Sequence, residues 1–241
     1  MTTPSGSVRA NLVDITARRV FAAEIGWSAG VIGRIDELGA ANPAWPCLLP
    51  GFIDAHVHTD VILLADPQHA PGLRQGITTH IIGQDGIGFA PAAPRVMATM
   101  RSYFAAINTV PDIGWDWSSV AEYLARFDDR TAINVAYLIP HGNVRIEAMG
   151  LDDRLPTADE MVTMQRLVAQ GMREGAIGYS TGLDYIPNPY SNTWELVELG
   201  KAASVQVGFQ YKATTGMDVN ERSGKWMDGP APAARSAAGE F

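Results

Sequence analysis

The chain of 241 residues carries 26 acidic and 18 basic side chains, which gives it a formal net charge of −8. This acidic balance argues against nucleic-acid binding as the main function, because phosphate contacts require clustered basic side chains. Hydrophobic residues make up 46% and charged residues 18% of the chain, a composition typical of a globular protein with a substantial buried core.

Two features bear on the cellular compartment. The single cysteine, Cys47, excludes an intrachain disulfide and fits a reducing environment. The N-terminal residues lack the apolar stretch of a signal peptide, and no segment is apolar over the length that a bilayer requires. We therefore expect a cytoplasmic protein that does not act at a membrane.

The first 50 residues predict a small β-structure. Short extended runs cover 11–16, 20–27 and 31–35, and a Ser-Ala-Gly turn precedes the last of them. Three strands are too few for an independently stable domain. We expect this piece to pack on another part of the protein.

After residue 50, apolar strands alternate with helices. The predicted strands are 48–56, 77–83, 132–140 and 176–181. Two helices begin with capping boxes, one formed by Ser119 and Glu122 and the other by Thr157 and Glu160. Apolar strands joined by helices indicate a parallel sheet buried on both faces, and therefore the α/β class.

Two histidines, His56 and His58, close the first of these strands. Side chains two residues apart in a strand point to the same side, so both imidazole rings can face one point. Imidazole is the commonest metal ligand, and two neutral rings at this spacing suit zinc or a similar divalent cation. The alternative is a pair of polar residues that only end the strand.

Several segments carry a resemblance to a known family. The run LLPGFIDAHVHTD, at 48–60, resembles the first-strand signature of the amidohydrolase superfamily, metal-dependent hydrolases built on a distorted (β/α)8 barrel. Further segments are similar to the N-acyl-D-amino-acid deacylases, or D-aminoacylases. These segments are QGITT leading to GQDG, then HGN, then GYSTGL with the following tyrosine. They occur in the family order and cover most of the first 200 residues.

The resemblance implies an α/β fold, an incomplete (β/α)8 metallo-amidohydrolase barrel with a small N-terminal β-domain. Residues 1–50 would form the N-terminal β-piece of a composite β-domain, and residues 51–204 the first half of the barrel. Residues 205–241 would form a divergent and potentially disordered tail, with a fifth strand at 205–211 as one interpretation.

The resemblance also implies the site residues. It makes His56 and His58 metal ligands, and it places Asp85 where many of these deacylases have a metal-bridging cysteine. Aspartate is likewise a competent ligand of zinc, the implied cofactor. Tyr185 matches a tyrosine that in the family lies near the substrate carboxylate or acyl group. His141 ends the third predicted strand at the same barrel face, where it could support the metal ligands from behind or bind substrate. Purely structural roles remain alternatives: a turn for Asp85, backbone contacts for His141 and loop packing for Tyr185.

The sequence departs from the family pattern in one respect. All five histidines lie at or before His141, so the two further ligand histidines and the catalytic aspartate of the family are missing. The catalytic base is therefore unassigned. A complete barrel needs about 250 residues, more than follow residue 50. We expect a C-terminally truncated or frameshifted chain, or one that a second chain completes.

The expected reaction is hydrolysis of a non-peptide C–N bond in a small N-acyl-D-amino acid, with this chain inactive on its own. One alternative is another amidohydrolase reaction, on a cyclic amide or an aminopurine, which would use the same first-strand ligands. The other alternative is a non-catalytic fragment or subunit.

Overall fold

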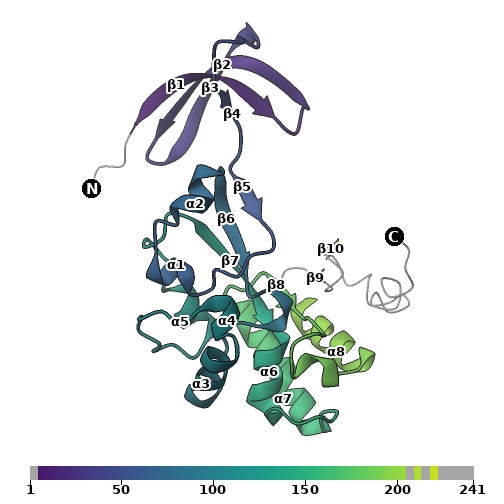
Figure 1. Cartoon of the computed structure of the whole chain (residues 1–241). Coiled ribbons are helices and arrows are strands. Elements are labelled where there is room, and N and C mark those ends of the chain that lie inside the picture. Colours follow the sequence, from purple (N-terminus) through teal and green to yellow (C-terminus); the bar gives the residue numbers. More distant parts are fainter. Residues whose placement is uncertain (1–4, 205–208, 213–217, 222–241) are drawn as a thin grey trace. The chain divides into compact units, whose positions relative to one another are not determined.

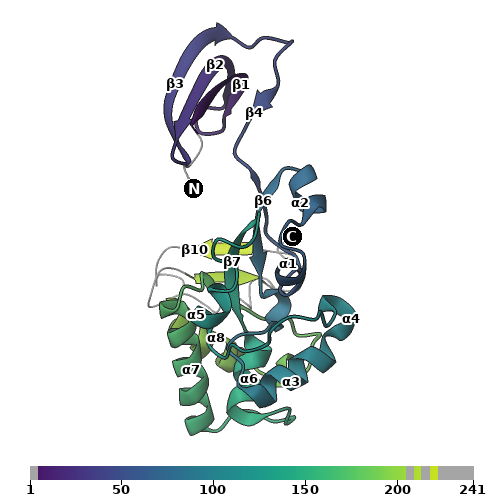
Figure 2. The same cartoon turned by 90° about the vertical axis from the view of Figure 1, so that its left-hand side faces the viewer.

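The structure is a computed structural model that describes residues 5–204, 209–212 and 218–221. The chain divides into two compact units, one ending at Gly51 and the other beginning at Phe52. Figures 1 and 2 show the helices and strands of each unit from two sides.

The first unit is a four-stranded sheet with the order β3-β2-β1-β4. Strands β1 (Gly6–Asp14), β2 (Arg19–Ser28) and β3 (Val31–Ala40) are antiparallel neighbours. The short β4 (Cys47–Leu48) runs parallel to β1. The three predicted strands are confirmed, and each is longer than predicted.

The connection between β2 and β3 is the predicted tight turn. Ala29 and Gly30 both have positive φ, at 52° and 77°, as a two-residue hairpin turn of type I′ requires. The core of this unit is small. It consists of Ala10, Phe21, Ala23 and Ile25, with Leu12 and Leu48 packed against them.

The prediction of one continuous strand over 48–56 is wrong. Its first part belongs to β4 in the first unit, and β5 (Phe52–Asp54) opens the second unit. Pro50 lies between them and lacks the N–H that a strand needs to continue its ladder. The boundary between the two units therefore lies inside the predicted strand.

The second unit contains the predicted parallel sheet. Strands β5, β6 (Ile77–Ile82), β7 (Asn134–Pro140) and β8 (Gly178–Ser180) are neighbours in chain order, and each adjacent pair is parallel. The last four residues of β7 and all of β8 are buried. Burial explains the nearly continuous apolar sequence of β7, which has a neighbouring strand on each side.

Helical segments connect the strands. They are α1 (Ile62–Ala65), α2 (Ala70–Arg74), η1 (Gln84–Gly86), α3 (Pro94–Tyr103), α4 (Ala105–Asn108), α5 (Val120–Leu124), α6 (His141–Met149), α7 (Ala158–Arg173), η2 (Asn188–Tyr190) and α8 (Thr193–Ser204). Helix α7 contacts α6 on one side and α8 on the other, so the three lie side by side (Figures 1 and 2). No helix in the described part of the chain has the length and apolar character needed to cross a membrane.

Both predicted capping boxes are confirmed. Ser119 and Glu122 cap α5, and Thr157 and Glu160 cap α7, each pair exchanging side-chain and backbone hydrogen bonds. Helix α7 directs one apolar face into the core. The buried residues of that face are Met161, Met164, Val168, Gly171 and Met172.

Part of the C-terminal segment forms a short antiparallel pair. Strand β9 (Phe209–Lys212) pairs with β10 (Asp218–Glu221). The strand proposed at 205–211 overlaps β9 over its last residues. The other residues beyond 204 lie outside the described part of the chain, and so does most of the predicted tail.

Candidate metal centre

The candidate ligands lie just beyond the ends of two adjacent strands. Strand β5 ends at Asp54 and β6 ends at Ile82. Because β5 and β6 are parallel neighbours, their carboxyl ends meet at one edge of the sheet. His56 and His58 follow β5, and Asp85 follows β6.

The two histidines do not lie on a strand, so the prediction that the two-residue period of a strand brings their rings to one side is wrong. β5 stops at Asp54, and His56 and His58 belong to the loop that follows. The carboxylate of Asp54 accepts the backbone N–H of His56 at 3.2 Å and helps to fix the start of this loop. The rings converge because of the loop conformation and not because of the two-residue period of a strand.

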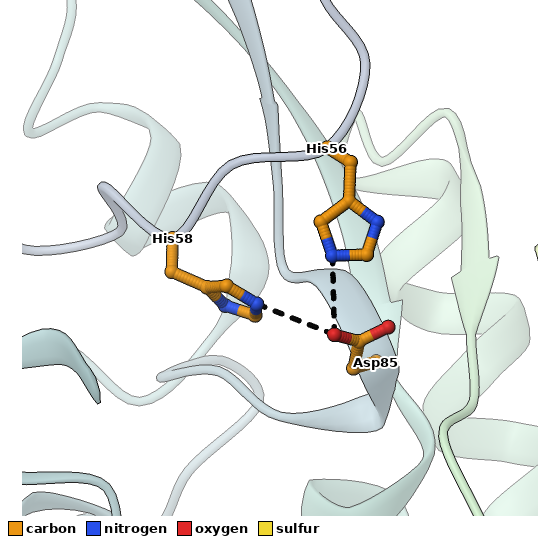
Figure 3. Close-up of side chains that lie close together, drawn as sticks. All are labelled: His56, His58 and Asp85. Carbon is orange, nitrogen blue, oxygen red and sulfur yellow. Dashed lines mark hydrogen bonds and ion pairs between the residues drawn. The ribbon is translucent and has the colours of Figure 1, made fainter. Parts of the chain in front are cut away.

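The predicted convergence of the three side chains is confirmed. Nε2 of His56 lies 3.1 Å from Oδ2 of Asp85, and Nε2 of His58 lies 3.3 Å from the same oxygen (Figure 3). One ligand atom from each residue lies within 4.8 Å of the other two. Within the described residues, these three form the one such cluster of histidine, cysteine or carboxylate side chains.

The backbone conformation of Asp85 directs its carboxylate toward the histidines. Asp85 has φ 57° and ψ 21°, in the left-handed region, which aspartate tolerates better than most residues. The chain enters this turn through Gly83, at φ 75°, where a Cβ atom would collide with the carbonyl oxygen of Leu138. The Gly-Gln-Asp-Gly sequence is therefore suited to this turn.

The charges within the cluster support one another. The hydrogen bond to Asp85 raises the pKa of His58 above its usual value, against the opposing effect of burial. Burial would raise the pKa of Asp85, but the hydrogen bonds and charges of His58 and His56 outweigh it and lower that pKa. Asp85 is therefore ionised at neutral pH, which is the state that binds a cation.

The cluster fits a divalent metal such as zinc. Imidazole nitrogen and carboxylate oxygen are both zinc ligands. Two ligand atoms about 2.0–2.2 Å from one tetrahedral zinc lie roughly 3.3–3.6 Å apart. The separations of 3.1 Å and 3.3 Å between the histidine nitrogens and Asp85 are close to that spacing.

Asp60 is a buried carboxyl group beside this cluster that the sequence analysis did not identify. It has no exposed surface, and its Oδ1 accepts the N–H of Gly83 at 3.0 Å. Burial raises the pKa of Asp60 to about 6, although the charge of His58 opposes the shift. Its position two residues after His58, within the first-strand signature, is the sequence signal by which it could have been identified.

The structure places His141 in the protein interior, at the start of α6. Its Nδ1 lies 2.9 Å from Oγ1 of Thr181, and its Nε2 lies 2.8 Å from Oε1 of Glu195. Both ring nitrogens are therefore engaged by protein side chains. Glu195 also pairs with Arg145, and the sequence analysis identified neither of these two residues.

Tyr185 lies in the loop after β8 and is half-buried against Phe104, with ring centroids 6.3 Å apart. Burial raises the pKa of Tyr185, and the negative charge of Asp85 contributes to the shift. Its hydroxyl is therefore a protonated donor that lies close enough to Asp85 to be affected by its charge.

A model of the amidohydrolase family matches residues 47–187. The N-acyl-D-glutamate deacylase of Alcaligenes xylosoxydans xylosoxydans is 31% identical over 191 residues, which are 76% of this chain and 38% of that protein. A shorter match, 51% identical over 53 residues, links the chain to the adenine deaminase of Parabacteroides distasonis and covers 22% of this chain and 9% of that protein.

The fold also resembles a solved deacylase. The crystal structure of N-acyl-D-glutamate deacylase from Bordetella bronchiseptica is 30% identical and gives a TM-score of 0.70 over 85% of this chain and 43% of that chain. That crystal structure holds zinc and a phosphonate inhibitor that mimics the tetrahedral intermediate of the reaction. The chain thus spans about two fifths of the length of the relatives it matches.

These comparisons confirm the predicted resemblance to the deacylases. The family match covers more than half of the chain and includes both histidines, Asp85, His141 and Tyr185. The neighbouring structure has the same kind of fold. The chain belongs to the amidohydrolase family, and N-acyl-D-amino-acid deacylases are among its relatives.

Proposed function

We propose that the chain is part of a zinc-dependent amidohydrolase that hydrolyses N-acyl-D-amino acids, with His56, His58 and Asp85 as metal ligands. One observation carries the proposal: the three side chains converge at the carboxyl ends of two adjacent parallel strands. Barrel enzymes keep their active sites at this face. The zinc-containing deacylase structure supports the choice of metal.

A divalent metal in such a site supplies Lewis acidity toward the amide carbonyl and a nucleophilic water at neutral pH. Asp85 brings a negative charge to the cluster, and the two imidazoles bring neutral nitrogen ligands. Tyr185 keeps its proton, so it can donate a hydrogen bond to a carboxylate or acyl oxygen of the substrate. Both ring nitrogens of His141 already have partners. We therefore assign His141 an indirect role on the substrate side, through its contact with Thr181.

We further propose that the four parallel strands of the second unit are the first part of a barrel that other strands complete. Those strands would come from a longer form of the chain or from a second chain. Phe52 and Ile53 of the edge strand β5 are 53% and 63% exposed, as expected for a sheet that further structure covers. We expect the chain alone to lack appreciable turnover and to function within that larger assembly.

Adenine deamination is the second candidate reaction. It is favoured by the 51% identical match to an adenine deaminase, but that match spans only 53 residues. The deacylase match is longer, at 191 residues. We therefore rank deacylation first.

Zinc binding by the full 241-residue chain tests the proposed site. Each protein is first freed of metal and then dialysed against zinc. We expect the parent to bind zinc and the double variant His56→Ala/His58→Ala to bind none. His69→Ala is the matched control, because this histidine packs against His80, at 5.1 Å between ring centroids, and contributes no ligand atom to the cluster. Equal zinc contents in parent and double variant would refute the assignment.

Turnover tests the reaction. The zinc-loaded chain is assayed on an N-acetyl-D-amino acid, a dihydropyrimidine and adenine. Turnover of about 1 per second or more on the first substrate would confirm the deacylase reaction and contradict the need for a completed barrel. Comparable turnover on adenine or the cyclic amide would contradict the ranking.

A further inference from the structure

Four buried polar side chains hold the tight turn Gly83–Gly86, here named the Asp85 turn, and one of them, Gln84, belongs to the turn itself. They are Asp60, Gln84, Ser180 and Asn188, each at most 1% exposed. Oδ1 of Asp60 accepts the N–H of Gly83 at 3.0 Å. Oγ of Ser180 accepts the N–H of Gly86, also at 3.0 Å, and donates to the carbonyl of Gly83. The two ends of the turn are therefore held from opposite parts of the chain.

Gln84 links the Asp85 turn to the histidine loop. Its Nε2 donates to the carbonyl oxygens of Ala55 and Ile81, each at 2.8 Å. Ala55 directly precedes His56. This side chain therefore ties the segment that carries one candidate ligand to the segment that carries another.

Asn188 contacts the backbone at Asp85 itself. Its Nδ2 lies 3.0 Å from the carbonyl oxygen of Gly182, 3.3 Å from that of Asp85 and 3.4 Å from that of Gly86. An amide group has two N–H donors, so one of them serves two of these three oxygens. Asn188 is thus the side chain that joins the loop after β8 to the left-handed part of the Asp85 turn.

We propose that Asn188 is a positioning residue of the metal centre, whose amide holds the backbone of Asp85 in the conformation that turns its carboxylate toward His56 and His58. The inference rests on the metal site proposed above. Asn188 acts through Asp85 and need not touch the metal or the substrate.

The backbone of the Asp85 turn explains why such a clamp is needed. Asp85 at φ 57° and Gly86 at φ 70° are consecutive residues in the left-handed region. Their carbonyl oxygens, together with that of Gly182, lie around one amide group in the interior. Without the N–H donors the carbonyl oxygens of Asp85 and Gly86 would lose these hydrogen bonds, whereas that of Gly182 would keep the N–H of Tyr185 at 3.2 Å. A non-glycine residue at positive φ would then relax toward a commoner conformation. The carboxylate of Asp85 would then leave the histidines.

The test compares Asn188→Leu with the matched variant Asn143→Leu in the full chain. Asn143 is also an asparagine without exposed surface, and its Nδ2 donates to a backbone carbonyl, that of Pro91, at 3.1 Å. Within the described residues, Asn143 forms no hydrogen bond to the Asp85 turn. Leucine has the same number of side-chain heavy atoms and the same branching as asparagine, although it is bulkier. Asn188→Ala, which removes the amide without introducing bulk, repeats the test with a smaller perturbation of packing.

The first measurement is the zinc dissociation constant. Loss of a group that orients a metal ligand typically weakens binding about 10- to 100-fold. We expect that weakening for both Asn188 variants. We expect Asn143→Leu to bind zinc as the parent does, even if it unfolds at a lower denaturant concentration.

The second measurement needs no metal. Labelling aspartate with ¹³C and glycine with ¹⁵N selects two peptide units in this sequence, Asp85–Gly86 and Asp228–Gly229. In the zinc-free protein, the ¹³Cα and ¹³Cβ shifts of Asp85 report whether its φ is positive. We expect the left-handed signature in the parent and in Asn143→Leu, and its loss in the Asn188 variants.

The two measurements separate the inference from the proposed site. If the parent binds no zinc, the proposed metal site fails, and the shifts of Asp85 still decide the role of Asn188. The inference is overturned if Asp85 keeps its left-handed shifts in Asn188→Leu and Asn188→Ala. It is equally overturned if Asn143→Leu weakens zinc binding as much as they do.

Discussion

Nε2 of His141 lies 2.8 Å from Oε1 of Glu195, and neither side chain has any exposed surface. Glu195 also receives two hydrogen bonds from Nη1 of Arg145, at 2.5 Å and 2.6 Å. Through Thr181, at 2.9 Å, His141 extends this cluster to the loop after β8. A neutral His141 therefore lies beside a balanced pair of opposite charges that joins α6 to α8.

Replacement of Glu195 by glutamine should destabilise the fold strongly. The variant leaves the guanidinium of Arg145 buried without a counter-charge, and breaking a buried ion pair in this way typically costs about 3–5 kcal/mol. Urea unfolding of parent and variant measures the difference. Glu198→Gln in the same helix is the control, because Glu198 pairs with Lys201 near the surface and its loss should cost less than about 1 kcal/mol. Similar losses for both variants would contradict the account.

The stability contributed by His141 should decrease in acid. Burial lowers the pKa of His141 below its ordinary value of 6.5, although the hydrogen bond to Glu195 opposes the shift. Below pH 6.5 the unfolded chain therefore binds a proton at this position before the folded chain does. This contribution is fully present above the unfolded pKa and is lost as the pH falls through the folded pKa.

His141→Gln isolates that contribution from the other histidines. We expect the difference in unfolding free energy between parent and variant to be constant above about pH 7 and to shrink toward about pH 5. Denaturant unfolding across this range measures it. A difference that grows as the pH falls would mean that the folded protein holds His141 protonated.

Loss of the α7 cap should have a moderate cost. The side chain of Thr157 accepts the N–H of Glu160 in the capping box. Thr157→Ala should therefore lower the unfolding free energy by about 1 kcal/mol, within a usual range of roughly 0.5–2. Thr163→Ala, at a half-buried position inside the same helix, should be neutral or slightly stabilising, since alanine has the higher helix propensity. A reversed order of the two variants would show that the box does not stabilise α7.

A methyl group at Gly182 should weaken zinc binding. A Cβ atom there would lie 2.5 Å from the carbonyl oxygen of Asp85 and 2.9 Å from its Cβ, closer than van der Waals contact allows. Gly182→Ala therefore displaces Asp85, and a metal ligand must be held within about 0.5 Å of its productive position. We expect a zinc dissociation constant raised about tenfold or more. Gly114→Ala, which meets only the exposed carboxylate of Asp116, should bind zinc as the parent does.

The features that the sequence alone determined are those set by neighbouring residues. The capping boxes at Ser119 and Thr157 depend on contacts across three residues, and both form as predicted. The apolar runs predicted β6, β7 and β8 because buried parallel strands must be apolar on both faces. His56 and His58 were identified by their spacing and by the family resemblance, and Asp85 by the resemblance alone. The three meet because they follow adjacent strands, whose carboxyl ends lie at one edge of the sheet.

Contacts between distant segments were decided only by the tertiary structure. Asn188 meets the carbonyl of Gly86 across 102 positions of sequence, and Glu195 meets Arg145 across 50. No local pattern marks such pairs, because a buried amide or carboxylate has the same sequence signature as an exposed one. The conformation of the loop carrying His56 likewise depends on where β5 ends, and the pairing with β6, which stops at Asp54, fixes that end. Tertiary packing decides which polar groups lose water, and each of those groups must then find a partner within the fold.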